Sequence, residues 1–250
     1  MRSIISSILV LCLLTACSSA SSSDAPSPGS GTGGSTARFT VSGNTLYTVS
    51  NTALQAYDIS SSSDPKKGNK TILGFGVETI FPYQNNLFIG TQTGMYIYDI
   101  NQPNAPKSVG IYTHILSCDP VVVQGNYAYV TLRSGTNCRN QSVTTNSLDV
   151  IDISNLANPK LLRSYPMTNP RGLGADSTLL FVGEGDYGLR VMDISDPTNV
   201  RELNYFYDTK TYDVIPAKKL LIVTGPKGIF EYSYADLKQL KLLSTIPVQP

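Results

Sequence analysis

The sequence predicts an all-β protein, and most specifically a β-propeller of five four-stranded blades. One observation is a short strand motif that recurs four times and ends in an acid, at Asp58, Asp99, Asp152 and Asp193. These acids are 41, 53 and 41 residues apart, close to the roughly 40–45 residues of a propeller blade. The composition agrees, because 15 Tyr, 20 Gly and no Trp in 250 residues favour short twisted strands with frequent turns.

Residues 1–16, which precede the repeats, are expected to be a secretion signal. Arg2 supplies a positive start, and the apolar run over residues 4–14 is too short to span a bilayer core of about 30 Å. The end of this segment, LLTAC at Leu13–Cys17, resembles the bacterial lipoprotein box. The resemblance implies cleavage before Cys17 and attachment of palmitate-type lipid to its thiol, which anchors a protein to a membrane. An ordinary signal peptide with a chance cysteine is the alternative, because the small residues before the cysteine also suit the ordinary peptidase.

Residues 17–36 are expected to be the lipidated cysteine and a flexible tether. The stretch from Ser18 to Thr36 consists mainly of Ser, Gly and Pro and has almost no apolar side chain to bury. In the sorting rule for such lipoproteins, an Asp directly after the cysteine retains the protein at the inner membrane. Ser18 stands there instead, so the resemblance implies an outer-membrane lipoprotein, on either the periplasmic or the surface face.

Residues 37–250 are expected to be the propeller. A fifth, degenerate copy of the motif places Ser233 where the acid stands in the other copies. Eight residues beyond each motif end lies a basic residue: Lys66, Lys107, Lys160, Arg201 and Lys241. An Asp that ends a strand can accept backbone N–H bonds in an Asx turn, and a Lys on an outer strand protects an exposed sheet edge. A ring of carboxylates that binds cations or a basic ligand is the alternative.

Each repeat divides into four β-prone runs, clearest in the fourth repeat, where the runs begin at Arg171, Leu179, Leu189 and Arg201. Apolar residues occur in both phases of the third run, so both faces of each sheet should be covered, as when blades pack face to face. No closing blade is shared between the two ends, so closure should depend on packing between the first and last blades. A four-bladed or an open arrangement also fits. Glu231, where the other copies have Ala, Ile or Val, indicates a wetter neighbour for the last blade.

The motifs MYIYDI, LDVIDIS and LRVMDIS, with the following NxxNPK and DPTNVR segments, resemble the LVIVD repeat of bacterial surface and secreted proteins. The resemblance covers roughly Arg38 to Val248. It implies a β-propeller and a lipoprotein habit, and the family carries no established reaction to transfer. The fifth copy departs most from the family pattern, because Ser233 replaces the Asp.

The third repeat is 12 residues longer than its neighbours, and the excess lies in a loop over Arg133–Ser147. In an antiparallel four-stranded blade, this loop and the approach to the first strand lie at the same end, so Cys118 and Cys138 should lie close together there. Cys12 leaves with the signal and Cys17 is acylated, which leaves these two thiols. An exported protein permits a disulfide between them, worth about 3 kcal/mol for a loop of this length. Two buried free thiols are the alternative.

The same end of the propeller should gather the loops that contact a ligand. The candidate residues on this binding face are His114, Arg133, Arg139, Arg171, Glu184, Asp186, Tyr187 and Tyr207. Ordinary solvated loop residues are the alternative for each one singly.

The sequence gives little support for catalysis, cofactors or metals. A single His and the lack of GxSxG, CxxC and HExxH motifs argue against triad hydrolysis, zinc and haem. A net charge of +1 gives no field that would attract nucleic acid. We therefore expect a non-enzymatic, lipid-anchored envelope propeller that binds or scaffolds a protein or an envelope polymer, without cofactor, metal or nucleic acid. A carbohydrate-active hydrolase that uses Glu184 or Asp186 on the loop-rich face is the alternative.

Overall fold

The computed structural model describes residues 33–113, 120–134 and 146–248. Within these segments the chain forms twenty strands that pair into five separate four-stranded sheets, and no helix long and apolar enough to cross a membrane is found among them. The prediction of an all-β propeller with five four-stranded blades is therefore confirmed.

The strands follow one another with the same order in every blade. Blade 1 contains β1 (Phe39–Ser42), β2 (Thr45–Val49), β3 (Ala53–Asp58) and β4 (Lys66–Ile72); blade 2 contains β5 (Val77–Tyr83), β6 (Asn86–Thr91), β7 (Gly94–Asp99) and β8 (Lys107–Thr113); blade 3 contains β9 (Val121–Gln124), β10 (Tyr127–Leu132), β11 (Ser147–Asp152) and β12 (Lys160–Pro166); blade 4 contains β13 (Leu173–Asp176), β14 (Leu179–Gly183), β15 (Leu189–Asp193) and β16 (Arg201–Phe206); blade 5 contains β17 (Asp213–Ala217), β18 (Leu220–Gly225), β19 (Gly228–Ser233) and β20 (Lys241–Pro247).

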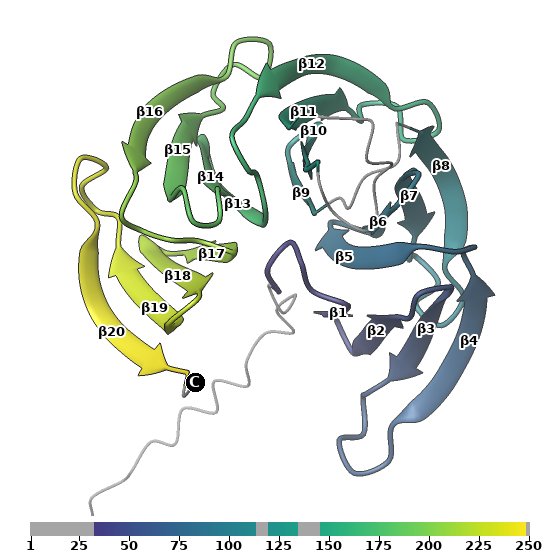
Figure 1. The fold of residues 1–250 in the computed structure, drawn as a ribbon. Coiled ribbons are helices and arrows are strands. Elements are labelled where there is room, and N and C mark those ends of the chain that lie inside the picture. The colour runs from purple at the N-terminus through teal and green to yellow at the C-terminus, as the bar shows by residue number, and fades with distance from the viewer. Residues whose placement is uncertain (1–32, 114–119, 135–145, 249–250) are drawn as a thin grey trace, which may run out of the picture.

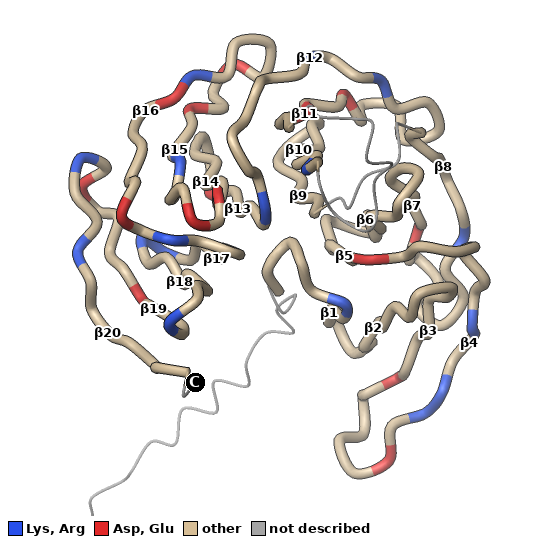
Figure 2. The backbone as a smooth tube through the Cα atoms, viewed as in Figure 1, with Lys and Arg blue, Asp and Glu red and all other residues tan. Residues whose placement is uncertain are grey.

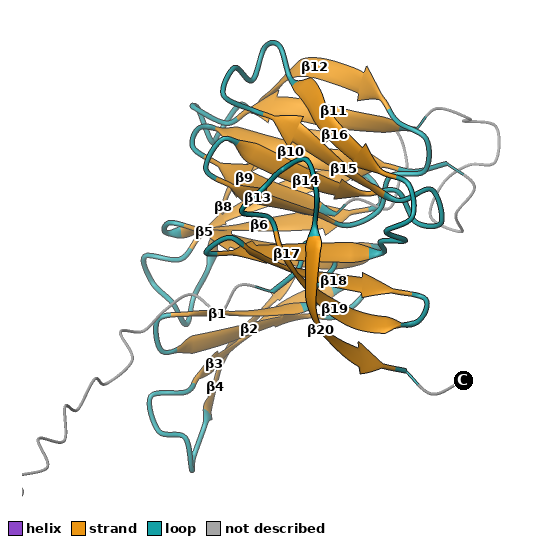
Figure 3. Cartoon of the chain, turned by 90° about the vertical axis from the view of Figure 1, so that its left-hand side faces the viewer, coloured by secondary structure: helices purple, strands orange, loops and turns teal. Residues whose placement is uncertain are grey.

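The first strand of each blade lies nearest the central axis and the fourth lies at the outer edge (Figure 1). Consecutive blades contact each other through these inner strands, from β1 with β5 to β13 with β17. Because neighbouring strands are antiparallel, the connections between blades and the turns between second and third strands share one end of the molecule, which Figure 3 shows from the side. This end is the loop-rich face expected from the sequence.

The acid that ends each third strand caps a turn, as predicted. Its Oδ1 accepts the backbone N–H two residues later, at N···O distances of 2.9 Å for Asp58, 2.6 Å for Asp99, 2.8 Å for Asp152 and 2.9 Å for Asp193. In the fifth copy, Ser233 accepts the same bond at 3.4 Å. No group of three or more acidic, His or Cys side chains suited to a metal occurs in the described part of the chain, so nothing there supports the alternative of a cation-binding ring of carboxylates.

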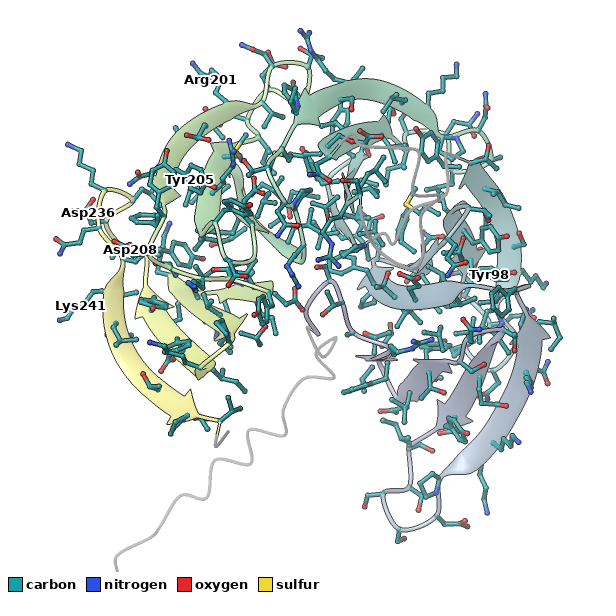
Figure 4. The ribbon with its side chains drawn as sticks, in the orientation of Figure 1. Tyr98, Arg201, Tyr205, Asp208, Asp236 and Lys241 are labelled. Atoms are coloured by element: carbon teal, nitrogen blue, oxygen red, sulfur yellow. The ribbon has the colours of Figure 1, made fainter. Side chains whose placement is uncertain are left out.

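The basic residue that follows each motif is the cross-strand partner of the motif's last residue. Lys66 pairs with Asp58 in the sheet register, and the equivalent pair in blade 4 also forms an ion pair, between Arg201 and Asp193 at 2.8 Å. Figure 2 shows these Lys and Arg positions along the outer strands, and in Figure 4 Arg201 and Lys241 point away from the ring. The residues thus occupy the exposed edges, as the edge-protection hypothesis requires.

Four hydrophobic clusters hold the blades together, one at each interface between consecutive blades. At the last of them, Phe181 of blade 4 packs on Tyr234 of blade 5 with ring centroids 4.8 Å apart. Over the described ranges no such cluster joins blade 5 to blade 1, which lie at the two ends of an arc in Figure 1. The expectation that packing between the first and last blades closes the ring is therefore wrong, and the open alternative is the one observed.

The segment that precedes β1 links the two ends of the arc near the axis. Ser35 is 1% exposed; its hydroxyl donates to Asp213 of blade 5 at 3.1 Å and accepts the N–H of Leu173 in blade 4 at 2.7 Å. The Thr36 hydroxyl donates to the other carboxylate oxygen of Asp213 at 2.6 Å, and the carbonyl of Ala37 accepts an N–H from blade 2. Ser35 and Thr36, which the sequence analysis assigned to the tether, are thus hydrogen-bonded to the propeller.

Candidate functional site

A pocket of about 490 Å³ opens on the loop-rich face, where the inner strands begin beside the central axis. All five blades and the segment before β1 contribute to it, because the inner strands begin here and the ends of the second strands adjoin them. The lining residues are Thr36, Arg38, Asn51, Val77, Glu78, Thr79, Pro120, Arg133, Pro170, Arg171, Gly172, Tyr212, Asp213 and Thr224. A concave site of this size, built by five repeats around one axis, is the usual kind of ligand site for such an architecture.

Three arginines meet in this pocket. Arg38 donates from Nη2 to the carbonyl of Val77 at 2.7 Å, and the guanidinium of Arg171 lies 4.7 Å from the centre of the Tyr212 ring. Arg133, at the end of β10, is half-buried; burial and the positive charge of Arg171 lower its pKa, which Glu78 partly offsets. Figure 2 shows Lys or Arg positions in blue beside β1, β10 and β13.

Arg171 is fixed by its surroundings rather than by a carboxylate. Its N–H donates to the carbonyl of Gly183 at 2.7 Å, and its carbonyl accepts the Thr131 hydroxyl at 2.6 Å. Its Nε is buried and has no hydrogen-bond partner in the described structure. A side chain at Gly185 would come within 2.5 Å of that nitrogen, and Gly185 has φ +62°. The sequence therefore places glycine where the arginine passes closest to the backbone.

The floor of the pocket is the buried carboxylate of Asp213. Burial raises its pKa, against the opposing effect of hydrogen bonds from Thr36, Val214 and Ser35. A Cβ at Gly172 would lie 2.0 Å from one carboxylate oxygen, so the backbone must come this close for the carboxylate to fit. Asp213 is therefore held by the architecture, and the other charged side chains that line the pocket are the three arginines and Glu78.

The residues predicted to rim the binding face separate into distinct groups. Arg133 and Arg171 line the axial pocket together. Tyr187 and Tyr207 are exposed at 55% and 68%, and Asp186 is exposed with Lys210 Nζ 3.4 Å from its carboxylate. His114, Arg139, both cysteines of the predicted disulfide and Cys17 lie outside the described residues.

Glu184 does not belong to the exposed rim where the sequence analysis placed it. Its side chain is fully buried, and Arg190 Nε donates to it at 2.7 Å. The backbone N–H groups of Thr168 and Asn169 also donate to its two oxygens. Glu184 therefore ties the connection between blades 3 and 4 to the hairpin that follows β14. The sequence could not show this, because the partner arginine follows six residues later, beyond the turn.

Sequence reasoning missed Arg38, Glu78, Tyr212 and Asp213 as parts of the pocket. Each of them lies at or just before the start of an inner strand, at Phe39, Val77 or Asp213. The signal was present in the repeat alignment, since the first residue of every inner strand must lie at the same end of the axis.

Comparison with known proteins identifies the repeat and the fold. The family model described as "LVIVD repeat" matches residues 117–135, 142–167 and 179–209, which belong to blades 3 and 4. No curated protein matches the chain.

Solved structures with the same architecture include a functionally unknown protein from Desulfotomaculum acetoxidans DSM 771, with a TM-score of 0.64, 13% identity and coverage of 82% of this chain and 67% of that one. The periplasmic gluconolactonase PpgL of Pseudomonas aeruginosa has a TM-score of 0.61 and 13% identity, over 82% of this chain and 68% of that one. The computationally designed Ika8 protein has a TM-score of 0.59 and 14% identity, over 81% of this chain and 59% of that one. The chain therefore spans less than two thirds of the length of Ika8. At these identities the likeness establishes the fold alone.

Proposed function

This chain belongs to the LVIVD-repeat β-propellers, and from that premise we propose that it is a non-catalytic binding module that recognises an anionic ligand in its axial pocket. The ligand is an acidic group of an envelope polymer or of a protein. The propeller supplies the scaffold, and function depends on the side chains that its loops and strand ends present.

The observation that carries this proposal is the convergence of Arg38, Arg133 and Arg171 in one pocket. The whole chain has a net charge of only +1, so the attraction is local to the pocket. Guanidinium groups bind carboxylate or phosphate in bidentate geometry. Because Arg133 is partly desolvated beside Arg171, an anion between them would relieve their mutual repulsion.

We further propose that the protein is held at the outer membrane by lipid on Cys17. The support is the LLTAC sequence and the polar stretch from Ser18 onward. Replacing Cys17 by Ser should release the protein from the membrane fraction, and metabolic labelling with a fatty acid should then fail. Labelling that persists in the variant would contradict the anchor.

The hydrolase alternative receives no support from the carboxylate geometry. Glu184, one of its two candidate acids, is enclosed by Arg190 and two backbone N–H groups. Asp186 is exposed, with Lys210 Nζ 3.4 Å from its carboxylate, which is the environment of a solvated surface acid.

The binding proposal is tested by replacing Arg133 and Arg171 together with Ala. Envelope extract is passed over the immobilised protein, and a panel of acidic polysaccharides is titrated beside neutral dextran. We expect the double variant to bind the retained ligand at least about tenfold more weakly, with a smaller salt dependence than the parent.

The matched control is Arg163→Ala, which removes an exposed arginine from the outer strand β12. It should leave binding unchanged, and the melting temperature of every variant should be measured to confirm folding. Retention of the same ligands by the double variant with unaltered affinity would overturn the proposal. The nature of the retained molecule distinguishes a polymer from a protein.

A further inference from the structure

The four interfaces between consecutive blades are all of one kind. We call the face of a blade that packs on the following blade its trailing face, and the face that packs on the preceding blade its leading face. Each interface joins the trailing face of one blade to the leading face of the next. In blade 4 the trailing face includes Phe181, Leu189 and Val191, all fully buried against blade 5. The leading face of blade 5 supplies Val214 and Leu221 to the same cluster.

The trailing face of blade 5 has no following blade in the described structure. Its residues Ile222 and Ile229 are 38% and 41% exposed, whereas their counterparts in blade 4 are fully buried. Ile246, the cross-strand partner of Ile229, is 65% exposed. Glu231, opposite Ile222 in the register, is only half-buried and accepts a bond from Ser244. The trailing face of blade 5 is thus more solvated than the buried faces of the other blades, as the sequence analysis expected from Glu231.

The leading face of blade 1 is uncovered in the same way. Phe39 is 60% exposed, although the residues at its position in blades 2 to 5 are at most 1% exposed: Ile80, Val121, Leu173 and Val214. Leu46 and Tyr57 are half-buried, and Lys67, the cross-strand partner of Tyr57, is exposed. The arc therefore ends in one free face of each kind.

The two free faces are complementary in the side chains that the repeat places on them. In the first interface, Ala56 of the trailing face and Tyr98 of the leading face share one cluster. Glu231 stands at the position of Ala56, and Tyr57 at the position of Tyr98, in the repeat. An interface of the same kind would thus bring Glu231 of blade 5 to Tyr57 and the neighbouring Lys67 of blade 1, an acid against a hydroxyl and a cation.

Within residues 33–113, 120–134 and 146–248, no segment of the chain covers these faces. Its own first and last blades share no hydrophobic cluster within the described residues, and the segment before β1 is engaged at the axis by Asp213. The residues from Ser18 to Gly33 are almost entirely Ser, Gly, Pro, Asp and Thr with two Ala, and such a sequence has no large apolar side chain with which to cover Phe39 or Ile229.

We propose that the trailing face of blade 5 in one copy docks on the leading face of blade 1 in a second copy. The contact repeats the inter-blade packing already present four times in each chain. Because two different faces meet, the association is head-to-tail and leaves one free face of each kind at its ends. Copies can therefore add in succession to form an open chain, or they form a closed ring if the rotation between neighbouring copies brings the two ends together.

The test uses the full chain in detergent solution and two variants that each alter one face. Ile229→Glu changes the trailing face and Phe39→Glu the leading face; both residues are exposed, so folding should be preserved. Light scattering after size exclusion should show concentration-dependent oligomers for the parent and monomers for each variant alone. An equimolar mixture of the variants should form a heterodimer, because each retains the face that the other has lost.

Ile111→Glu is the matched control, since this isoleucine is 50% exposed on the outer strand β8 and should leave association unchanged. Charge exchange adds a second measurement. Glu231→Lys should weaken association at least about tenfold, and combining it with Lys67→Glu should restore it. A parent that remains monomeric at every concentration would overturn the proposal, as would variants that still associate alone or a mixture that fails to form the heterodimer.

Discussion

Two neighbouring acids on the turn after β14 should respond to mutation in opposite ways. Glu184 is fully buried, with Arg190 Nε 2.7 Å from its carboxylate and the N–H groups of Thr168 and Asn169 donating to its oxygens. Asp186 is 62% exposed and lies 3.4 Å from the Nζ of a lysine that is itself 52% exposed. We predict that Glu184→Ala destabilises the propeller strongly and that Asp186→Ala does not.

The size of the effect follows from what each substitution leaves behind. Removing Glu184 strands a largely buried guanidinium and two backbone donors, and breaking a buried pair typically costs 3–5 kcal/mol. Arg190 keeps an ion pair with Glu202 at 2.7 Å and is 18% exposed, so the lower end, about 3 kcal/mol, is expected. For a domain of this size that lowers the melting temperature by about 6–12 °C. An exposed pair such as that of Asp186 contributes at most about 1 kcal/mol.

Thermal unfolding followed by circular dichroism, with urea unfolding in parallel, measures both free energies. Glu184→Gln should fall between the parent and the Ala variant, because it keeps hydrogen-bond acceptors but loses the charge. The reasoning is refuted if Glu184→Ala unfolds within about 0.5 kcal/mol of the parent, or if Asp186→Ala is equally damaging. Loss of ligand binding with unchanged stability in Glu184→Ala would place Glu184 in the binding site instead.

Three further predictions concern the repeat and the axis. Gly188→Ala should lower the melting temperature by several degrees or more, because its φ is +120° and a Cβ would meet a backbone oxygen at 2.3 Å; Gly43→Ala, with φ +56° and no atom within 4 Å, should cost clearly less, and equal losses would contradict this. Burial raises the folded-state pKa of Asp213, so its contribution to stability is greatest below the unfolded pKa and is lost as pH rises through the folded pKa. Asp213→Asn should flatten the pH dependence of urea unfolding above the unfolded pKa of about 3.9; an unchanged slope would count against the raised pKa. Ser233→Asp should raise the free energy of unfolding by about 0.5 kcal/mol, because a carboxylate replaces the long 3.4 Å bond to the N–H of Ala235; a lower urea midpoint would be the contrary result.

The repeat architecture could be predicted because its causes are local. An Asp that accepts the N–H two residues on, as Asp152 does from Ser154, needs only neighbouring residues. Strand alternation and turn glycines such as Gly94 and Gly228, whose φ values are +157° and +138°, are also local properties. Strand direction alone predicted which end of the propeller carries the loops. It therefore also predicted that Arg133 and Arg171 lie at the same end.

The partners of side chains could not be predicted, because they depend on contacts between distant segments. Glu184 had the sequence environment of a solvated turn acid, but its oxygens also accept the N–H groups of Thr168 and Asn169 from the connection between blades 3 and 4. The bond from Ser35 to Asp213 joins residues 178 positions apart, and no local pattern indicates it.

The sequence by itself determined the module: its length, its four strands, its capped turn and its two apolar faces, since each depends on residues close together in the chain. Whether five such modules close on themselves was decided only in three dimensions, because closure depends on how successive blades are arranged around the axis. That arrangement leaves Phe39 and Ile229 exposed in the first and last blades, while three arginines line the pocket at the axis.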